Sequence, residues 1–300
     1  MARYINDGSK DAPKLCVYIN EDNLVDLRAD SIWPGFTGTA RLHRLAADGF
    51  EGIQLTGDAE PTPGSSFPHC GCDRINTPGE ADPIAAKHAR RGASCLTVHA
   101  GWGLECDADA FRLVESILTA SDRHQLPIFI ETHRSTMTQD MWRTVRMVEK
   151  FPEIRFNGDF SHYYTGQEMV YGGFEMKRDF MKPILDRVGF IHGRISSPGC
   201  MQVPVDSVTA RPQQAHGDVN YVEHFRELWT CAMRGFLLSA GPGDCLVFAP
   251  ELLSGRYYYA RLFPDAGGGL VEETDRYQQA LIYQHFARAC FIDALREAGG

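Results

Sequence analysis

The chain has 300 residues, of which 43% are hydrophobic and 23% are charged, and its formal net charge is −9. This composition is typical of soluble, globular proteins. A negative surface repels the phosphates of nucleic acids, so we expect no nucleic-acid partner. No run of about 18 uncharged apolar residues occurs, so we also expect no membrane span.

The N-terminal stretch MARYINDGSKDAPK lacks the apolar segment of a signal peptide, and the nine cysteines are scattered along the chain. Both features favour a cytoplasmic protein with reduced thiols. The stretch HCGCD at residues 69–73 contains the residue types of a metal site. Its Cys-x-Cys spacing is tight and it has no second pair, so we interpret Cys70 and Cys72 as thiols of a loop rather than zinc ligands.

Short apolar runs alternate with longer amphipathic runs along the chain. The short runs are rich in β-branched and aromatic residues and are often apolar on both faces, which is typical of buried parallel strands. The predicted strands are residues 15–20, 52–55, 95–100, 127–131, 155–159, 189–194 and 245–251, with an eighth placed within 257–263.

The amphipathic runs between the strands predict helices, because their apolar residues recur at helical spacing. Asp107 or Asp109 is expected to cap one of them, and Thr138 or Asp140 to start another. We expect glycines to end two of them, at Gly49 and Gly189. The predicted helices are residues 39–49, 107–120, 141–148, 180–188, 220–233 and 273–297.

Alternation of strands and helices implies a parallel sheet with right-handed crossovers. Seven or eight such units in 300 residues predict a (β/α)8 TIM barrel, an α/β fold formed as a single domain over residues 1–300 with an N-terminal extension at 1–13. The alternative is an open, doubly wound sheet. That fold should carry a G-x-G-x-x-G turn after its first strand, and the sequence has none there.

Polar side chains stand at or just beyond the C-terminal ends of the predicted strands. In a barrel these ends open onto one face, where active sites are built. The residues are His99, Trp102, Glu131, His133, Asp159, His162, His192, Arg194 and Glu251.

Four of these residues follow one another at about the spacing of one strand-helix unit. Asp159 lies 28 residues after Glu131, and His192 lies 33 residues after Asp159. Glu251 follows after a unit enlarged by a loop at 195–217, which we expect to cover the active site. Three carboxylates and an imidazole would be costly to bury together without a counter-charge. The sequence therefore predicts one bound divalent cation, Mn²⁺, Mg²⁺, Co²⁺ or Zn²⁺, since this ligand set does not choose strongly among them.

Several stretches resemble the xylose-isomerase-like TIM-barrel superfamily, which includes sugar-phosphate isomerase/epimerase-like proteins and endonuclease IV-type (AP endonuclease family 2) repair enzymes. The similar stretches are RLHRLAADGFEGIQL, CLTVHAGWG, IFIETHRSTMTQD, FNGDFSH, FIHGRISSPGCMQV and VFAPEL, which together span about residues 37–255. The resemblance implies that Glu131, Asp159, His192 and Glu251 are metal ligands and that His162 lies close to the metal. It also implies that the two glutamates flank the sugar carbon that exchanges a proton.

The sequence departs from the family pattern at two places. It has GIQL where family members often have GIEL, and Gln54 neither acts as a base nor binds a metal strongly. A three-zinc nuclease needs a further pair of ligands near the sixth predicted strand, where Arg194 stands instead. The resemblance therefore favours sugar chemistry over DNA repair.

The sequence thus predicts a metal-dependent isomerase or epimerase of a sugar or sugar phosphate, acting through a metal-stabilised enediolate. Glu131 and Glu251 would transfer the proton. Arg194, His99, His162 and Trp102 would contact the substrate, and His133 would face the substrate or lie near the metal. Alternatives are a lyase that dehydrates a polyol or keto-inositol, a repair nuclease and a non-catalytic sugar-binding barrel. The resemblance also implies a homo-oligomer.

Overall fold

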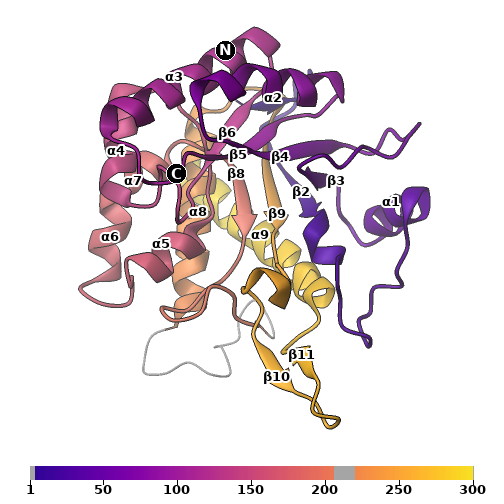
Figure 1. Ribbon diagram of the computed structural model, residues 1–300. Coiled ribbons are helices and arrows are strands. Elements are labelled where there is room, and N and C mark those ends of the chain that lie inside the picture. Colours follow the sequence, from indigo (N-terminus) through magenta and orange to yellow (C-terminus); the bar gives the residue numbers. More distant parts are fainter. Residues whose placement is uncertain (1–3, 206–219, 300) are drawn as a thin grey trace.

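The computed structural model describes residues 4–205 and 220–299 (Figure 1). Its centre is a closed barrel of eight parallel strands in chain order, because the last strand pairs with both the first and the seventh. The predicted single-domain (β/α)8 barrel is therefore confirmed. The barrel strands are β2 (Lys14–Asn20), β3 (Gly52–Thr56), β4 (His69–Ile75), β5 (Leu96–Ala100), β6 (Ile128–Glu131), β7 (Phe156–Asn157), β8 (Val188–Gly193) and β9 (Asp244–Pro250).

Helices lie around the outside of the strands (Figure 1). They are α1 (Gly38–Ala47), α2 (Pro78–Arg90), α3 (Asp107–His124), α4 (Met141–Lys150), α5 (Phe160–Gly166), α6 (Phe174–Phe180), α7 (Lys182–Leu185), α8 (Tyr221–Ser239) and α9 (Arg276–Ala298), with 3-10 turns η1 (Glu21–Leu24) and η2 (Gly255–Tyr257). A short strand, β1 (Ile5–Asn6), pairs antiparallel with β9. The hairpin β10 (Leu262–Pro264) and β11 (Leu270–Glu272) extends away from the barrel.

The stretch HCGCD was predicted to be a loop, and this prediction is wrong, because it forms β4. Cys70 and Cys72 are buried, free thiols within this strand. Asp73 accepts hydrogen bonds from Lys87 and His88, which ties β4 to α2. The polar residues of the stretch therefore anchor a strand to its helix. Helix α2, which begins with a capping box between Thr77 and Glu80, was not predicted.

Three further details differ from the prediction. Residues 257–263 are not a barrel strand: Tyr258 has a φ of 62°, so the chain turns there and leaves the barrel for the hairpin. Gly189 does not end a helix but lies within β8, where the ring of Phe129 fills the space of a side chain. Cys106 is the N-cap of α3, so Asp107 lies in the first helical turn, where the helix dipole favours an acidic side chain.

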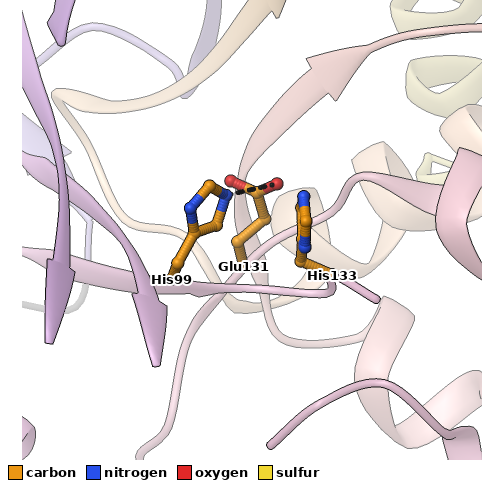
Figure 2. Close-up of side chains that lie close together, drawn as sticks. All are labelled: His99, Glu131 and His133. Atoms are coloured by element: carbon orange, nitrogen blue, oxygen red, sulfur yellow. Dashed lines mark ion pairs between the residues drawn. The ribbon is translucent and has the colours of Figure 1, made fainter. Parts of the chain in front are cut away.

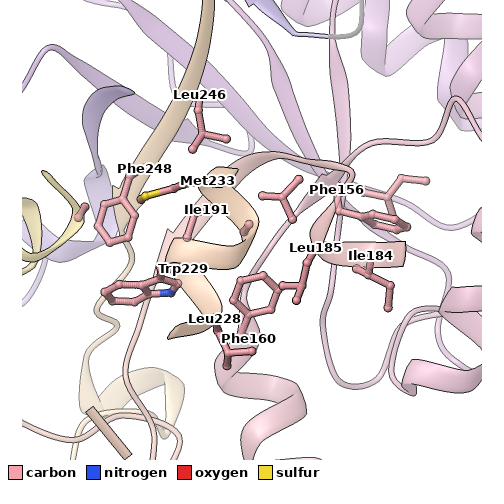
Figure 3. Close-up of a cluster of buried hydrophobic side chains, with 14 of the residues drawn as sticks. Phe156, Phe160, Ile184, Leu185, Ile191, Leu228, Trp229, Met233, Leu246 and Phe248 are labelled. Carbon is pink, nitrogen blue, oxygen red and sulfur yellow. The ribbon is translucent and has the colours of Figure 1, made fainter. Parts of the chain in front are cut away.

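Two apolar layers hold the barrel together. Side chains that point out from β7, β8 and β9 pack against α7 and α8, with Phe248 edge-on to Trp229 at 4.9 Å between ring centroids (Figure 3). A second, smaller cluster packs inside the barrel, and we call it the barrel floor. It consists of Tyr18, Cys70, Cys95, Phe129, Phe190, Val247 and Ala249.

Candidate metal centre

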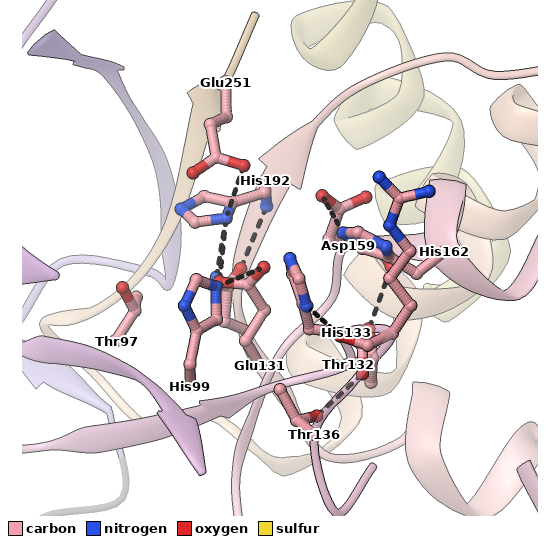
Figure 4. Close-up of polar contacts among 12 residues, drawn as sticks. Thr97, His99, Glu131, Thr132, His133, Thr136, Asp159, His162, His192 and Glu251 are labelled. Carbon is pink, nitrogen blue, oxygen red and sulfur yellow. Dashed lines mark hydrogen bonds and ion pairs between the residues drawn. The ribbon is translucent and has the colours of Figure 1, made fainter. Parts of the chain in front are cut away.

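Four predicted ligands meet at the C-terminal end of the barrel (Figure 4). Glu131 is the last residue of β6, and His192 lies in β8. Asp159 is the second residue after β7, and Glu251 directly follows β9. One ligand atom from each side chain lies within 4.8 Å of the others, and all four residues are buried. The structure thus brings together the four residues that the sequence analysis singled out.

The strands place these side chains by their alternating direction. Residues two apart in a strand point to the same face. Phe129 and Phe190 belong to the barrel floor, so Glu131 and His192 point into the same interior one layer higher. The apolar residues of each strand therefore support the polar residue that follows. This explains why a buried run ends abruptly on a carboxylate at Glu131.

Asp159 has two roles at once. Its Oδ1 caps α5 by accepting hydrogen bonds from the backbone nitrogen of Ser161 at 3.0 Å and from the hydroxyl of Ser161 at 2.5 Å. These bonds fix the carboxylate so that Oδ2 faces the other ligands. An aspartate at a strand end can therefore be a helix cap and a candidate ligand together.

Two buried oxygens of the cluster accept no hydrogen bond from any residue that the structure describes. They are Oε1 of Glu131 and Oδ2 of Asp159, which have ion-pair contacts instead: His99 lies 3.3 Å from the first, and Arg194 and His162 lie 3.0 Å and 3.4 Å from the second. A buried charged oxygen without a hydrogen bond is costly. Three carboxylates and one imidazole are also a donor set that divalent cations accept. The residues present therefore fit a divalent cation, whose identity the donor set leaves open.

Hydrogen bonds with two amide side chains, those of Gln54 and Asn157, orient the imidazole of His192. Gln54 donates to Thr97 at 2.8 Å, so its carbonyl oxygen faces Nε2 of His192, also at 2.8 Å. Asn157 accepts from the backbone nitrogen of His192, so its amide nitrogen faces Nδ1 at 3.0 Å. In the neutral imidazole, Nε2 therefore carries the proton, and Nδ1 presents its lone pair toward the carboxylates, as a metal ligand must.

These amides were not predicted as part of the site. Asn157 also donates to Oε2 of Glu131 at 3.0 Å, and Asn20 donates to both Gln54 and Glu251. Asn157 lies in β7, inside a buried strand and two residues before Asp159 in the sequence. That position was the available signal, since a polar residue inside a buried strand needs a partner.

Electrostatics within the cluster shift the pKa values of the four candidate ligands. Burial raises the pKa of Glu131, but His99 and His192 outweigh it and hold that pKa well below its usual range. Burial likewise opposes Arg194 and His162, which lower the pKa of Asp159. Burial dominates at Glu251, whose pKa is raised although His192 and Arg194 act against the shift.

Burial lowers the pKa of His192, but the carboxylates of Glu251 and Glu131 overcome this effect and raise its pKa to about 9. The imidazole lies between them: Nδ1 is 3.2 Å from Oε2 of Glu131 and 3.3 Å from Oε2 of Glu251 (Figure 4). The protonated imidazole carries a second proton at Nδ1, which a cation bound there would have to displace, so metal binding and proton release are linked.

Arg194 is buried against the cluster. Its Nη1 lies 3.0 Å from Oδ2 of Asp159, its Nη2 pairs with Oε2 of Glu251, and its Nε donates to the backbone oxygen of Glu251 at 3.0 Å. The arginine that we expected to contact substrate thus contacts two of the four candidate ligands. Its other face lies under the ring of Tyr259, 4.4 Å from the centroid.

Three histidine rings and a tyrosine form a row beside the carboxylates. Ring centroids are 4.3 Å apart between His99 and His133, 3.8 Å between His133 and His162, and 6.3 Å between His162 and Tyr259. The structure therefore brings all three predicted substrate-binding histidines to the centre. Tyr259 was not predicted to be part of the site, because residues 257–263 were expected to hold a barrel strand.

Trp102 does not join this row. Its side chain is 56% exposed, and the guanidinium of Arg74 lies over the indole ring at 3.8 Å. Among the residues described by the structure, no ring or cation contact links Trp102 to the four candidate ligands. Its role in binding substrate stays a prediction.

The predicted loop over the site is described as far as residue 205. Val203 donates to the backbone oxygen of Ile195 at 3.0 Å, and Val205 donates to the side chain of Gln279 in α9 at 2.8 Å. The remainder, 206–217, lies outside the described residues.

No helix in the described part of the chain is long and apolar enough to cross a membrane.

Comparison with known proteins supports the fold. A scan against protein-family models finds no match, and a search of curated proteins finds no similar sequence. Among solved structures, the chain is similar to 3-keto-D-glucoside 4-epimerase, YcjR, from E. coli, with a TM-score of 0.51 and 12% identity over 92% of this chain and 100% of that one.

Other similar structures have slightly lower TM-scores. D-allulose 3-epimerase from Methylomonas sp. has a TM-score of 0.49 and 11% identity over 97% of this chain and 99% of that chain. The probable 3-DHS dehydratase AsbF from Bacillus anthracis has a TM-score of 0.48 and 14% identity over 79% and 92%. At these identities the similarity concerns the (β/α)8 barrel fold alone, for which the match to the E. coli epimerase gives the support.

Proposed function

We propose that this protein is a metal-dependent isomerase or epimerase of a sugar or sugar phosphate. One observation carries the proposal: Glu131, Asp159, His192 and Glu251 converge at the C-terminal end of the barrel, with two buried oxygens that accept no hydrogen bond from the described residues. A centre of this kind, at the end of the barrel where TIM-barrel enzymes work, suits chemistry on substrate oxygens.

The placement of the two glutamates supports proton transfer. They lie on either side of His192, with one carboxylate oxygen of each within 3.3 Å of Nδ1. Such a pair can face a substrate carbon from two directions. One carboxylate would take the proton from the carbon next to a carbonyl, leaving the electron pair on the carbonyl oxygen, and the other carboxylate would return a proton.

A bound divalent cation would supply Lewis-acid stabilisation of the negative charge that develops on the substrate oxygens. Arg194 carries a fixed positive charge at the same place, and its guanidinium suits an oxyanion, a phosphate or a carboxylate of the substrate. His99, His133 and His162 would donate to hydroxyl groups, and Trp102 would offer an apolar face at the rim. Tyr259 lies over Arg194 and His162 and would help to exclude water.

Solvent-deuterium exchange tests this function. The protein would be incubated with Mn²⁺ and a panel of ketoses, aldoses and their phosphates in D₂O, and the products followed by NMR. We expect deuterium at the carbon next to the carbonyl, together with an isomerised or epimerised product. Glu251→Gln should lose the exchange, while Glu149→Gln, a change of an exposed glutamate on α4, should keep it.

Two outcomes would contradict the proposal. Sugar binding without exchange would indicate a non-catalytic binding barrel. Loss of water from a keto-polyol, without an isomerised product, would indicate a dehydratase that uses the same ligands.

A further inference from the structure

We propose that the substrate is an acidic sugar, whose phosphate or carboxylate group is bound by Arg74 and Arg134 at the rim of the candidate metal centre. These two arginines, which we call the rim pair, lie one step beyond two imidazoles. Arg74 pairs in register with His99 across β4 and β5, and Arg134 directly follows His133. In Figure 2 the two imidazoles lie on either side of Glu131. The proposal rests on the proposed function, because it names the class of sugar on which the same centre would act.

Arg74 faces the centre because of its place in β4. Residues two apart in a strand point to the same face. Cys70 belongs to the barrel floor, so Arg74, four residues later, points into the same interior nearer the C-terminal end of the strand. His99 stands in the same relation to Cys95, a floor residue that directly precedes β5. Both side chains therefore point to the end of the barrel at which the candidate ligands meet.

Uncharged groups hold the guanidinium of Arg74 in one place. Nη2 donates to the backbone oxygens of Gly101 at 2.7 Å and Ser135 at 3.3 Å, and Nε donates to the side chain of Asn76 at 2.9 Å. The guanidinium also lies over the indole of Trp102. Within the residues that the structure describes, Nη1 makes no hydrogen bond and no carboxylate forms an ion pair with this arginine. The guanidinium is therefore preorganised, and Nη1 can donate to a ligand.

The positive charge of Arg74 is costly where it stands. The side chain is half-buried, and burial lowers the pKa of its guanidinium, with Glu105 acting in the opposite direction. The carboxylate of Glu105 is itself engaged, because it accepts from the backbone nitrogens of Trp102 at 2.6 Å and Gly103 at 2.9 Å. A partly buried charge is destabilised until an opposite charge pairs with it. An anionic group of the substrate would supply that charge.

Arg134 offers a second guanidinium beside the same centre. Its side chain is exposed and lies over the ring of Tyr259, 5.0 Å from the centroid. Among the described residues, no carboxylate forms an ion pair with it. A ring contact at an exposed site is weak, so this guanidinium can still bind an anion. The two arginines are also linked, because Ser135, whose backbone oxygen accepts from Arg74, directly follows Arg134.

The charge of the metal-loaded centre also favours an anion. Arg194 and a divalent cation would balance the three candidate carboxylate ligands, so the rim pair would add positive charge in excess, although the whole chain has a net charge of −9. Local positive charge raises the concentration of anions and their rate of association. Arg194 is less suited to bind the acidic group itself, because Nη1, Nη2 and Nε already contact Asp159 and Glu251.

An alternative is that the rim pair consists of ordinary solvated arginines. Exposed arginines elsewhere on the described surface pair with carboxylates, as Arg112 does with Asp109 and Arg123 with Asp82. Solvation would account for Arg134 taken alone. It does not account for Arg74, whose half-buried charge is fixed by bonds to uncharged groups beside the centre. A bound anion accounts for both arginines.

Binding of sugars that cannot react tests the proposal apart from catalysis. D-glucitol, D-glucitol phosphate and D-gluconate lack an aldehyde or ketone, so they cannot be isomerised. In calorimetric titration of the Mn²⁺-loaded protein, we expect one or both acids to bind at least about 10-fold more tightly than D-glucitol, because hydrogen bonds between charged groups are strong. The acid that binds more tightly identifies phosphate or carboxylate as the group.

Three variants locate the preference. Arg134→Gln should weaken binding of the preferred acid by about 10-fold and leave that of D-glucitol unchanged, and Arg74→Gln should do the same. Arg90→Gln, a change of an exposed arginine at the end of α2, should bind all three sugars as the wild type does. The side chain of Arg134 makes no hydrogen bond with the described residues, so its variant should fold even if Arg74→Gln does not.

Equal affinity of the wild type for the neutral and acidic sugars would overturn the proposal, and so would a preference that survives in Arg134→Gln. Failure of the proposed function would give a different result. No sugar would then exchange hydrogen for deuterium, while the preference for acids and its loss in Arg134→Gln would remain. Deuterium exchange on neutral sugars, without a preference for acids, would support the function and contradict the acidic substrate.

Discussion

The two ends of the barrel are built by the same eight strands, yet their inward side chains differ in kind. At the floor, Tyr18, Phe129 and Phe190 pack as an apolar cluster with buried thiols. One layer higher, Glu131 and His192 belong to a buried network of charges and amides. One strand therefore has two roles. Its inward residue at the floor packs against neighbouring strands, and the residue two positions later is a candidate metal ligand.

The two layers also contribute differently to the stability of the fold. Burying aromatic side chains stabilises the fold in proportion to the area removed from water. Burying three carboxylates near one another costs stability unless cations or hydrogen bonds offset it. Arg194 and His192 offset part of that charge, and the proposed metal would offset more. We therefore expect the barrel floor to determine the free energy of unfolding. The charged layer above it, which we call the mouth, should determine metal affinity.

The largest expected effect concerns the mouth. Glu131→Ala removes a proposed ligand that also contacts His99, Asn157 and His192, so metal affinity should fall by more than the roughly 100-fold upper value for loss of a group that only orients a ligand. Calorimetric titration with Mn²⁺ measures it, with Glu149→Ala on α4 as the matched control. Unchanged affinity in Glu131→Ala would show that the metal, if bound, lies elsewhere.

The floor should respond in the opposite way. Phe129→Ala leaves a cavity beside Phe190 and against Gly189, so the free energy of unfolding should fall by about 3–5 kcal/mol. Urea denaturation measures this loss, and Leu238→Ala, a change of a side chain that is 68% exposed, should cost less than about 0.5 kcal/mol. Metal affinity of folded Phe129→Ala should stay within a few-fold of wild type. A loss of metal affinity as large as that of Glu131→Ala would contradict the separate roles of floor and mouth.

In the metal-free protein, the charged layer should make the free energy of unfolding depend on pH. The pKa of His192 rises from 6.5 to about 9 on folding, so its protonated form stabilises the folded state below pH 6.5, and this contribution is lost as the pH rises toward 9. The contribution is on the order of 3 kcal/mol. Urea denaturation from pH 6 to 10 should show a decline in the wild type that is absent in His192→Gln.

His285→Gln, a change of an exposed histidine on α9, serves as the control and should keep the decline. An equal decline in His192→Gln would mean that other groups cause it.

The smallest expected effect concerns the amides between the two layers. Gln54→Met removes the acceptor for Nε2 of His192 and the donor to Thr97 while keeping a similar volume. Loss of a group that orients a ligand typically lowers metal affinity by about 10–100-fold. Metal titration at fixed pH measures it. If affinity does not change, the network orients His192 by other bonds, of which Asn157 supplies two.

Much of the barrel could be predicted because buried parallel strands leave a strong pattern. Runs such as LCVYIN and PIFIE are apolar, β-branched and bounded by turns, and they became β2 and β6. β4 was missed because HCGCDRI contains glycine, thiols and charges in place of that pattern. Its strand conformation is set by neighbours, since β3 and β5 pair with it on both sides.

Residues of the candidate site could be predicted only where a charged or imidazole side chain stands at the end of a predicted strand. Glu131 and Glu251 each stand at the end of an apolar run, so their place in the barrel follows from the strand. Tyr259 could not be found in this way, because it reaches the centre through a loop whose path depends on tertiary contacts. The role of Gln54 depends on the direction of one amide, which Thr97 sets from a different strand.

A crystal structure with Mn²⁺ would test the central claim most directly. Anomalous scattering should show a peak about 2.0–2.3 Å from oxygens of Glu131, Asp159 and Glu251 and from Nδ1 of His192. A protein saturated with Mn²⁺ in solution, whose crystals show no peak among these four side chains, would contradict the account.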